Sequence, residues 1–508
     1  MPMSAVVVIG AGVGGLAVAA RLAHAGHGVT VLEQADRVGG KLGLHTRDGF
    51  RFDTGPSLVT MPYVLHALFE DTGGSLEDVL VLQPVEPIAR VRFPDGATLL
   101  TSADPTTMAV DLDRALGGTA AADWDRLMRR AAQIWAAVRV PYLESPRPGA
   151  RDLARLATRL GDLRTVAPHR TLRDMGERYL RDPRLRMVLD RYATSSGSDP
   201  RRAPAALAVV PYVEQTYGAW YVRGGLARLA AAIRQRAESL GAVVRTGADV
   251  VQIATGPRGV SGVRLAGGER IAADIVVANA DAAHVYRDLL PHRRQQRRLR
   301  RATPSLGGFV LLLGVRGRTK GLAHHSVLFG ADYDAEFDAV FGPAPQPVAD
   351  PTLYVSVPHD PTVAPEGHEA WFVLVNAPLQ GPVDWDAPGV APRYAARLLD
   401  LLAARGLDVR DRLVFAEHRT PADLQRATRA VGGAIYGTSS NGARAAFLRP
   451  ANRSPVPGLY LVGGSAHPGG GLPLVTLSAK IVADLVAVDL DQTAGASARR
   501  ARRTTTTS

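Results

Sequence analysis

Residues 6–15 read VVVIGAGVGG, a short apolar run that ends in glycines at the spacing Gly-x-Gly-x-x-Gly. An apolar strand that turns sharply into a helix needs Gly10 at the turn, since a side chain would clash there. Gly12 lets the backbone approach a pyrophosphate, and Gly15 lets the helix pack against its strand. Free N–H groups at such a helix N-terminus bind phosphate. The stretch predicts a dinucleotide-binding strand–turn–helix unit.

The residues that follow support this prediction. A second apolar run, Val29–Leu32, ends in Glu33, about 20 residues after the glycines, where an acid can accept hydrogen bonds from a ribose. Gly39-Gly40-Lys41 and Asp53-Thr54-Gly55-Pro56 come next. We expect Lys41 to neutralise a phosphate; a solvated surface lysine is the alternative.

A second glycine-rich loop lies near the other end of the chain, in residues 458–473, GLYLVGGSAHPGGGLP. A strand runs into this loop, and a helix is expected from about Leu474 to Val488. Glycines let the backbone approach a planar ligand, and the helix N-terminus faces negative charge. One ligand that touches both loops must be long, with a ring system at the second. This pairing favours FAD over NAD.

Composition limits the class of protein. The 508 residues allow two or three subdomains, and 46% hydrophobic with 21% charged residues indicates a globular chain. The absence of cysteine excludes disulfides and thiolate metal sites, and we expect no metal. The first strand begins almost at Met1, which predicts a cytoplasmic protein without a signal peptide. No apolar run reaches the roughly 18 residues of a membrane span.

The net charge of +12 has two interpretations that the sequence leaves open. One is a coding bias toward arginine, and the other is attraction to anionic lipid. The basic residues cluster at Arg293–Arg301 and in the tail 493–508, which we expect to be disordered. Aromatic residues make up 6% and no nucleic-acid-binding motif occurs, so we expect no nucleic-acid partner.

Hydrophobic periodicity divides the rest of the chain. Residues 105–204 have a helical period, and a predicted helix at 152–163 carries leucines on one face and arginines on another. It is either an ordinary surface helix or one that lies in a membrane interface. Residues 243–253 predict a strand, in which Val250 would frame an adenine with its backbone. Several strands are expected between 304 and 417.

The longer motifs resemble the bacterial phytoene desaturase type of carotenoid desaturase, over nearly the whole chain to about residue 490. The blocks that carry the resemblance are Val8–Leu16, Phe52–Leu58, His324-His325-Ser326 with Asp332–Phe337, Thr362–Gly367 and Gly458–Pro473. Residues 432–442 and 446–449, together with 462–471, are more similar to 3,4-desaturases of 1-hydroxycarotenoids than to phytoene enzymes.

The resemblance implies an α/β fold. It consists of a Rossmann-like FAD-binding domain of the glutathione reductase/amine oxidase type, a mixed-sheet substrate domain and a helical, membrane-associated region. We expect FAD binding by 1–80, 222–290 and 451–492, and substrate binding by 81–110 and 291–450. The helical region is then 111–221, and the tail 493–508.

The resemblance also implies the reaction: desaturation of a carotenoid or similar isoprenoid polyene by hydride transfer to flavin N5, with quinone or oxygen as final acceptor. Such a substrate would be collected from a bilayer, which favours peripheral association with the inner face of the cell membrane. The expected cofactor-binding residues are Gly10, Gly12, Gly14, Gly15, Glu33, Gly39, Gly40, Lys41, Asp53, Thr54, Gly55, Pro56, Val250, Gly463, Gly464, Pro468, Gly469, Gly470 and Gly471.

No catalytic residue stands out. His324, His325, His467 and Glu336 are polar candidates, although loop histidines more often hold structure. A ketolase, a saturase or an isomerase on the same scaffold is an alternative outcome. A prenyl-lipid escort of the GDP-dissociation-inhibitor type is the non-enzymatic alternative, but such a protein has no reason to keep Glu33, Asp53 and the second glycine loop together.

Overall fold

The glycine-rich stretch that opens the chain forms the centre of a five-stranded parallel sheet in the computed structural model, which describes residues 3–149, 165–442 and 445–505. The predicted helix at 152–163 lies outside the described residues. The sheet order is β19-β13-β1-β2-β9, and every pairing is parallel. The strands are β1 Ala5–Ile9, β2 Gly28–Leu32, β9 Val243–Arg245, β13 Ile275–Ala278 and β19 Leu459–Leu461.

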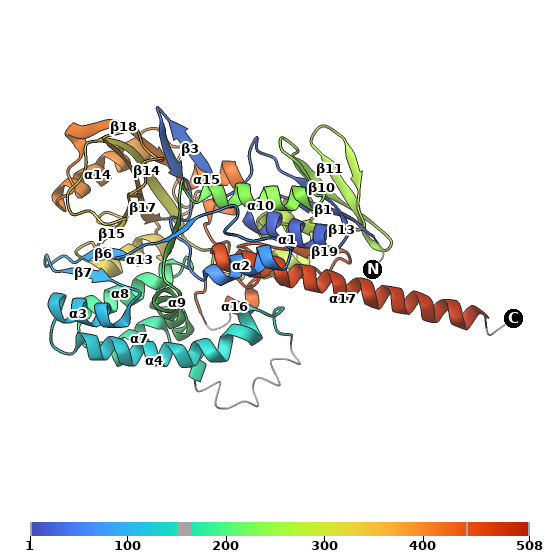
Figure 1. Cartoon of the computed structure of the whole chain (residues 1–508), viewed down its shortest axis with the longest axis horizontal. Helices are drawn as coiled ribbons and strands as arrows, with labels where there is room; N and C mark the ends of the chain where they lie inside the picture. Colours follow the sequence, from blue (N-terminus) through green and yellow to red (C-terminus); the bar gives the residue numbers. More distant parts are fainter. Residues whose placement is uncertain (1–2, 150–164, 443–444, 506–508) are drawn as a thin grey trace.

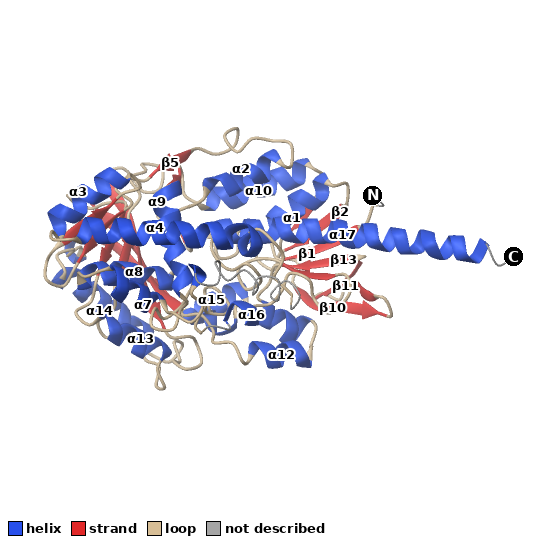
Figure 2. Cartoon of the chain, turned by 90° about the horizontal axis from the view of Figure 1, so that it is seen from below, coloured by secondary structure: helices blue, strands red, loops and turns tan. Residues whose placement is uncertain are grey.

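Both faces of this sheet are covered, as the nearly unbroken apolar sequence of β1 predicts. Val6 and Val8 face a helical layer, whereas Val7 and Ile9 face a small antiparallel sheet. Figure 2 shows α1, α2 and α10 on one side of β1 and β13, and β10 and β11 on the other. The covering elements are α1 Val13–His24, α2 Pro62–Glu70, α10 Ala227–Ser239, α17 Leu472–Thr505, β10 Val250–Gly256, β11 Gly259–Leu265 and β12 Arg270–Ala272.

A second, seven-stranded mixed sheet lies at the other end of the molecule (Figure 1). Its order is β18-β14-β17-β16-β15-β6-β7, and the β15–β6 pair is parallel. Alternate residues of β14 pack into two different hydrophobic cores. Leu311 and Leu313 pack under α14 (Val390–Ala404), while Val310 and Leu312 pack on Phe50 of β4 (Phe50–Asp53). The strands are β6 Ala89–Arg92, β7 Thr98–Thr101, β14 Gly307–Arg316, β15 His325–Leu328, β16 Leu353–Ser356, β17 His368–Ala377 and β18 Leu413–Arg419.

Shorter elements join the two sheets. Two ribbons pair β3 Leu44–Arg47 with β4 Phe50–Asp53, and β5 Leu82–Pro84 with β8 Trp220–Val222. The second of these ribbons links segments that are far apart in the sequence. The helices around the larger sheet and between the domains are α11 Ala282–His284, α12 Arg293–Leu299, α13 Tyr333–Phe341, α14 Val390–Ala404, α15 Pro421–Thr428 and α16 Ala445–Leu448.

A helical layer covers the β6–β7 end of the large sheet (Figure 1). Trp124 and Leu127 of α4 and Leu189 of α8 share one core with Val91 and Leu99 of the sheet. The layer comprises α3 Pro105–Ala115, α4 Ala120–Val138, α7 Leu172–Tyr179, α8 Pro183–Thr194 and α9 Val209–Tyr217, with a π-helical turn at Arg139–Leu143 and a 3-10 turn at Ala205–Ala208.

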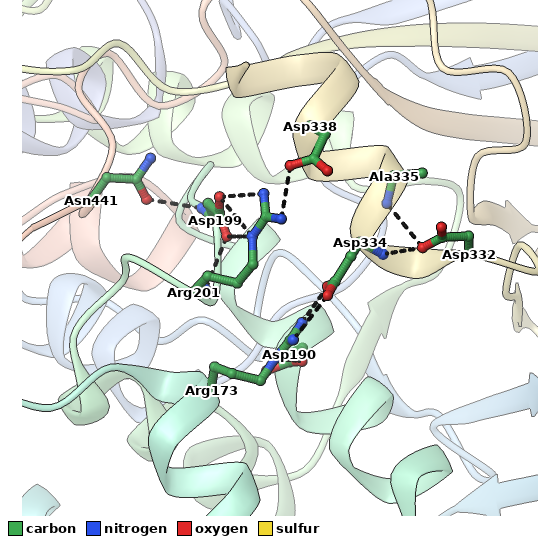
Figure 3. A network of polar contacts seen from close by, with 9 residues as sticks. All are labelled: Arg173, Asp190, Asp199, Arg201, Asp332, Asp334, Ala335, Asp338 and Asn441. Carbon is green, nitrogen blue, oxygen red and sulfur yellow. Dashed lines mark hydrogen bonds and ion pairs between the residues drawn. The ribbon is translucent and has the colours of Figure 1, made fainter. Parts of the chain in front are cut away.

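Charged side chains fasten this layer to the large-sheet domain (Figure 3). Arg173 of α7 forms ion pairs with Asp190 of α8 at 2.7 Å and with Asp334 of α13 at 2.5 Å. Arg201 forms a second bridge, to Asp199 at 2.9 Å and to Asp338 of α13 at 2.8 Å. The two bridges therefore tie α7, α8 and the segment that follows α8 to α13.

The predicted α/β class is confirmed, and two local expectations were wrong. Residues 243–253 form two strands in different sheets, because the chain turns at Gly247, whose φ is +66°, and Ala248 N–H donates to the Glu33 carbonyl. The expected disordered tail is helical as far as Thr505, since α17 continues well past Val488 and extends beyond the body of the protein (Figure 1). Its alanine and arginine residues favour a helix.

We expect Gly15→Ala to destabilise the protein. A Cβ at this position would lie 2.1 Å from the Gly10 carbonyl oxygen and 3.1 Å from the Asn279 Cβ, which forces α1 away from β1. Overpacking of this kind costs about 1–3 kcal/mol or more. The midpoint of thermal unfolding, followed by circular dichroism, measures the loss.

Gly267→Ala is the matched control. Gly267 lies in the turn between β11 and β12, and a Cβ there would meet no atom within 4 Å. Its unfolding midpoint should equal that of the wild type. Equal midpoints for the Gly15 and Gly267 variants would contradict the packing argument.

Candidate functional site

The first glycine loop has the geometry that its sequence predicts. Gly10 has a φ of +92°, and its N–H donates to the Leu32 carbonyl at 2.7 Å. α1 begins directly after Gly12, so its first turn presents backbone N–H groups without intrahelical acceptors. Gly14 packs on the second loop, because a Cβ on it would lie 3.2 Å from the Gly463 Cα.

Glu33 is 7% exposed and lies against the same loop. Its Oε2 accepts a hydrogen bond from the Ala11 N–H at 2.7 Å, and its Oε1 accepts one from the Ala35 N–H at 3.0 Å. Each oxygen keeps a second lone pair, so the carboxylate can hold the loop and accept from hydroxyl groups as well.

The Gly39–Lys41 segment contacts the first loop. Gly39 N–H donates to the Ala11 carbonyl at 2.9 Å, and Gly40 packs on Gly12. Lys41 has two bonded partners that the motif did not predict: its Nζ donates to the carbonyls of Ala434 at 2.9 Å and Ile435 at 2.6 Å. Its contact with a phosphate stays a prediction. Burial lowers the pKa of Lys41 to about 8, against the effect of Asp281. Its bonded partners thus tie the first loop to residues 434–435.

Asp53 has a structural partner. Its two oxygens accept from the N–H groups of Leu226 at 2.7 Å and Ala227 at 2.8 Å, which caps the N-terminus of α10. Burial raises the pKa of Asp53, and the two N–H donors oppose that rise.

The rest of this motif packs on the Gly39–Lys41 segment. Thr54 N–H donates to the Gly43 carbonyl at 2.9 Å, and a Cβ on Gly55 would lie 2.1 Å from the Lys41 carbonyl oxygen. Pro56 follows in the same half-buried turn.

The second glycine loop connects β19 to α17. Gly463 N–H donates to Ser478 Oγ at 3.2 Å, and Gly464 lies next to Gly470, where a Cβ would be 3.4 Å from the Gly470 Cα. Gly469 and Gly471 have φ values of +149° and +108°, and α17 begins immediately afterwards. Pro468 is buried at the start of this turn. The structure therefore brings the two predicted loops together.

Two residues of this site, Asn279 and Arg449, were missed by the sequence analysis. Asn279 lies between Gly14 and Gly463, and its Nδ2 donates weakly to the Gly10 carbonyl at 3.4 Å. Arg449 is buried and donates to the Gly464 carbonyl at 2.6 Å and to the Tyr436 carbonyl at 3.1 Å. The Tyr436 ring lies against Gly470. The available signal was a polar residue close to a glycine-rich segment. The pattern does not show which backbone groups such a residue contacts, and the contacts of Asn279 are far away in the sequence.

Val250 lies where the sequence predicted, at the start of β10 and in one core with Ile9 and Leu32. It is two residues beyond Ala248, whose N–H donates to the Glu33 carbonyl. Its proximity to adenine stays a prediction.

The polar candidates separate into two groups. Glu336 is structural, since it accepts from Thr352 N–H at 2.8 Å and Asn376 Nδ2 at 2.6 Å in the core beneath α13. His467 Nε2 donates to the Ser145 carbonyl at 3.0 Å, and the ring packs on Tyr142. The rings of His324 and His325 lie against each other at a tilt of 44°, with their centroids 4.4 Å apart. Of these, His325 lines a cavity.

Two cavities meet the large sheet. The first lies between the sheet and helices α8 and α9. Its apolar wall includes Leu58, which follows the Asp53–Pro56 motif. The second cavity contacts Asp53 and Tyr221. The first is lined by Leu58, Ile88, Ala89, Val91, Thr101, Val188, Arg191, Tyr192, Glu214, His325, Phe329 and Tyr354.

Comparisons with known proteins agree with this geometry. A family model described as flavin containing amine oxidoreductase matches residues 13–357. A 4,4'-diapolycopene oxygenase from Methylomonas sp is 36% identical, covering 96% of this chain and 98% of the relative. A zeta-carotene-forming phytoene desaturase from Myxococcus xanthus is 35% identical, covering 94% and 93%. A putrescine oxidase structure has a TM-score of 0.63 at 19% identity, covering 96% and 99%, which shows the fold alone.

We expect buried histidines to make the protein less stable in mild acid. Burial lowers the pKa of His324 and of His467 to about 4. In the unfolded chain both titrate near 6.5, so between pH 6.5 and 4 the unfolded state binds protons that the folded state does not. The contribution of these histidines to the free energy of unfolding is fully present above pH 6.5. It is lost as the pH falls toward 4, by on the order of 3 kcal/mol for each histidine. Denaturant unfolding at a series of pH values measures the fall.

His467→Gln should make this loss smaller. The control is His24→Gln, since His24 is exposed at the end of α1 and burial cannot act on it. Parallel pH curves for the wild type and the His467 variant would refute the assignment.

Proposed function

The chain belongs to the family of flavin-containing amine oxidoreductases, and from this membership we propose that it dehydrogenates a carotenoid or similar isoprenoid polyene. The family makes it an FAD-dependent oxidoreductase, so the predicted resemblance, cofactor and class of enzyme are confirmed. The substrate and the residues that act on it are the proposal.

The described residues fit FAD. The Glu33 carboxylate retains acceptor capacity beside the first glycine loop, where a ribose would lie. The N-terminus of α1 offers N–H groups to a diphosphate, without a side chain at Gly12 or Gly14. The N-terminus of α17 and the turn at Gly469–Gly471 suit a planar ring. We assign the cofactor-binding residues of the two loops on this basis.

The first cavity supports a polyene substrate, and it is the observation that carries the proposal. Most of its wall is aliphatic or aromatic, from Leu58 and Ile88 to Val188 and Phe329. The two relatives described above have names that refer to diapolycopene and phytoene, both long isoprenoid hydrocarbons. By pattern, residues 432–442 and 446–449, together with 462–471, favour 3,4-desaturation of a hydroxylated carotenoid within this class.

When bound, FAD supplies an acceptor for the two electrons of a hydride. The chain's own residues position the substrate and exclude water. The apolar wall holds the polyene between β6, β15 and α8. His325 is neutral in this wall because burial keeps its pKa well below the ordinary value, so it adds no charge to the cavity. The final electron acceptor is quinone or oxygen in this proposal.

Oxygenation of the polyene is the second candidate function. It is favoured by the Methylomonas relative, which is named an oxygenase. The two reactions differ in the mass of the product: dehydrogenation removes two hydrogens, while oxygenation adds oxygen.

The two sheets support the proposed domain division. The strands of the parallel sheet come from residues 5–32, 243–278 and 459–461, and we assign FAD binding to the segments 1–80, 222–290 and 451–492. The seven-stranded sheet comes from 89–101 and 307–419, which supports substrate binding by 81–110 and 291–450.

Association with a membrane surface completes the proposal. Within the part of the chain that the structure describes, no helix is long and apolar enough to cross a bilayer. Arg293, Arg294 and Arg297 of α12 are exposed, and Arg300 and Arg301 extend the same basic segment. We assign this segment to contact with anionic lipid on the inner face of the cell membrane.

The flavin-loaded protein should dehydrogenate a polyene that is supplied in vesicles. The product should have two hydrogens fewer and absorb at longer wavelength, because a desaturation lengthens the conjugated system. Parallel reactions with quinone and with oxygen identify the acceptor. A product that gains oxygen would replace desaturation with oxygenation, and a protein that takes up no flavin on reconstitution would revive the escort alternative.

Glu33→Ala tests the cofactor site in the same assay. Loss of the carboxylate should weaken FAD retention at least tenfold, since the N–H groups of Ala11, in the first glycine loop, and of Ala35 lose their acceptor. Glu70→Ala is the control, because Glu70 is exposed at the end of α2. Unchanged flavin content in the Glu33 variant would contradict the assignment.

Binding to vesicles should depend on the charge of α12. The triple variant Arg293/Arg294/Arg297→Gln should bind anionic vesicles several-fold more weakly in a flotation assay, because each arginine near such a surface contributes about 1 kcal/mol. A control with the same charge, Arg258/Arg270/Arg318→Gln, alters exposed arginines elsewhere. Equal flotation of both variants would exclude α12 as the contact.

A further inference from the structure

The first cavity contains a pair of charged side chains that its apolar wall does not require. Arg191 of α8 and Glu214 of α9 both line it. Arg191 is half-buried, and within the described part of the chain its guanidinium has neither an ion pair nor a hydrogen bond. Its one close partner is the Tyr354 ring, whose centroid is 5.4 Å from the guanidinium carbon. A guanidinium carries five N–H donors, so Arg191 has donors to spare.

The Glu214 carboxylate also has few partners. One carboxylate oxygen accepts from the Tyr192 hydroxyl at 2.5 Å, and this is the single hydrogen bond that the described residues give the Glu214 side chain. Burial raises the pKa of Glu214, and the Tyr192 hydrogen bond and the charge of Arg191 oppose the rise. The two charges therefore act on each other across the cavity without forming a direct ion pair.

The neighbouring polar groups are fixed among themselves. Tyr354 is hydrogen-bonded to Ser57 and, at 2.9 Å, to His325 Nδ1. His325 is 1% exposed, and its Nε2 lacks a partner in the described structure. The position of Arg191 is also fixed, because Arg173 holds the adjacent Asp190 and so anchors α8 (Figure 3). The cavity thus presents a rigid set of donors and an acceptor.

We propose that Arg191 and Glu214 form a polar subsite that binds a terminal hydroxyl on an otherwise apolar polyene, and that they decide which polyene the enzyme accepts. The inference rests on the proposed function and adds the specificity-determining residues. A hydroxyl can accept from the guanidinium and donate to the carboxylate at the same time.

Other end groups match this pair less well. A hydrocarbon end would displace water from both charged groups and give them no partner, which costs free energy. A carboxylate end would place a like charge beside Glu214, and an aldehyde can only accept. A site built around a hydroxyl rejects the analogue that lacks it.

The test compares two polyenes of equal length and conjugation, one with a terminal tertiary hydroxyl and one with hydrogen in its place. The flavin-loaded protein is titrated with each, and Kd is read from the shift in polyene absorption; kcat/KM is measured separately. The wild type should favour the hydroxylated polyene about tenfold or more in both quantities. Arg191→Met and Glu214→Leu should bring the ratio close to one, and Arg191→Lys should keep part of it.

Val188→Ala is the matched control in the same cavity, since it removes apolar contact from both polyenes and should leave their ratio unchanged. Flavin absorption and the unfolding midpoint identify variants that do not fold, and the conservative Arg191→Lys and Glu214→Gln variants then serve in their place.

The inference and the proposed function fail in different ways. Dehydrogenation of both polyenes at equal kcat/KM, or a preference that Arg191→Met retains, overturns the subsite and leaves the proposed reaction standing. A binding preference that Arg191→Met abolishes, without turnover of either polyene, supports the subsite and overturns the proposed reaction.

Discussion

The contact between the Gly10 carbonyl and Gly15 is the constraint on which the rest of the protein depends. The absence of a side chain there lets α1 lie directly on β1. α1 in turn packs against both α10 and α17, which belong to the middle and the end of the chain. The same approach leaves the first turn of α1 facing the second glycine loop, with Asn279 between them. One close backbone contact thus sets the sheet, its helical cover and the cofactor site.

The parts of the fold that the sequence predicted are those with local causes. The turn at Gly10, the strand that ends in Glu33 and the helix after Gly471 each depend on residues a few positions apart. The break between β9 and β10 at Gly247 depends on a contact with Glu33, more than 200 positions away. Local periodicity does not show this contact and therefore predicted one strand where there are two. Asn279 acts on the distant Gly10 in the same way, whereas Arg449 donates to the Gly464 carbonyl 15 positions further along the chain; composition gives no sign of either contact.

Two residues of the predicted motifs have protein partners that local pattern did not reveal. Lys41 beside two glycines suggested a phosphate ligand, but its ammonium is bonded to two carbonyls that reach it from residues 434 and 435. Asp53 was expected at the cofactor, and its carboxylate caps α10. Both side chains therefore hold the segments that surround the site in place.

The parallel sheet has a further consequence for how this protein folds. Its central strand β1 covers Ala5–Ile9, whereas its edge strand β19 covers Leu459–Leu461 and is followed by the second glycine loop. β13 has its outer neighbour in β19, and α1 is covered by α17, so neither is complete until segments far apart in the sequence have met. Contacts of such long sequence separation form slowly and leave apolar surface open to aggregation. Until β19 and α17 are in place, the faces of β13 and α1 that they cover therefore stay open to aggregation.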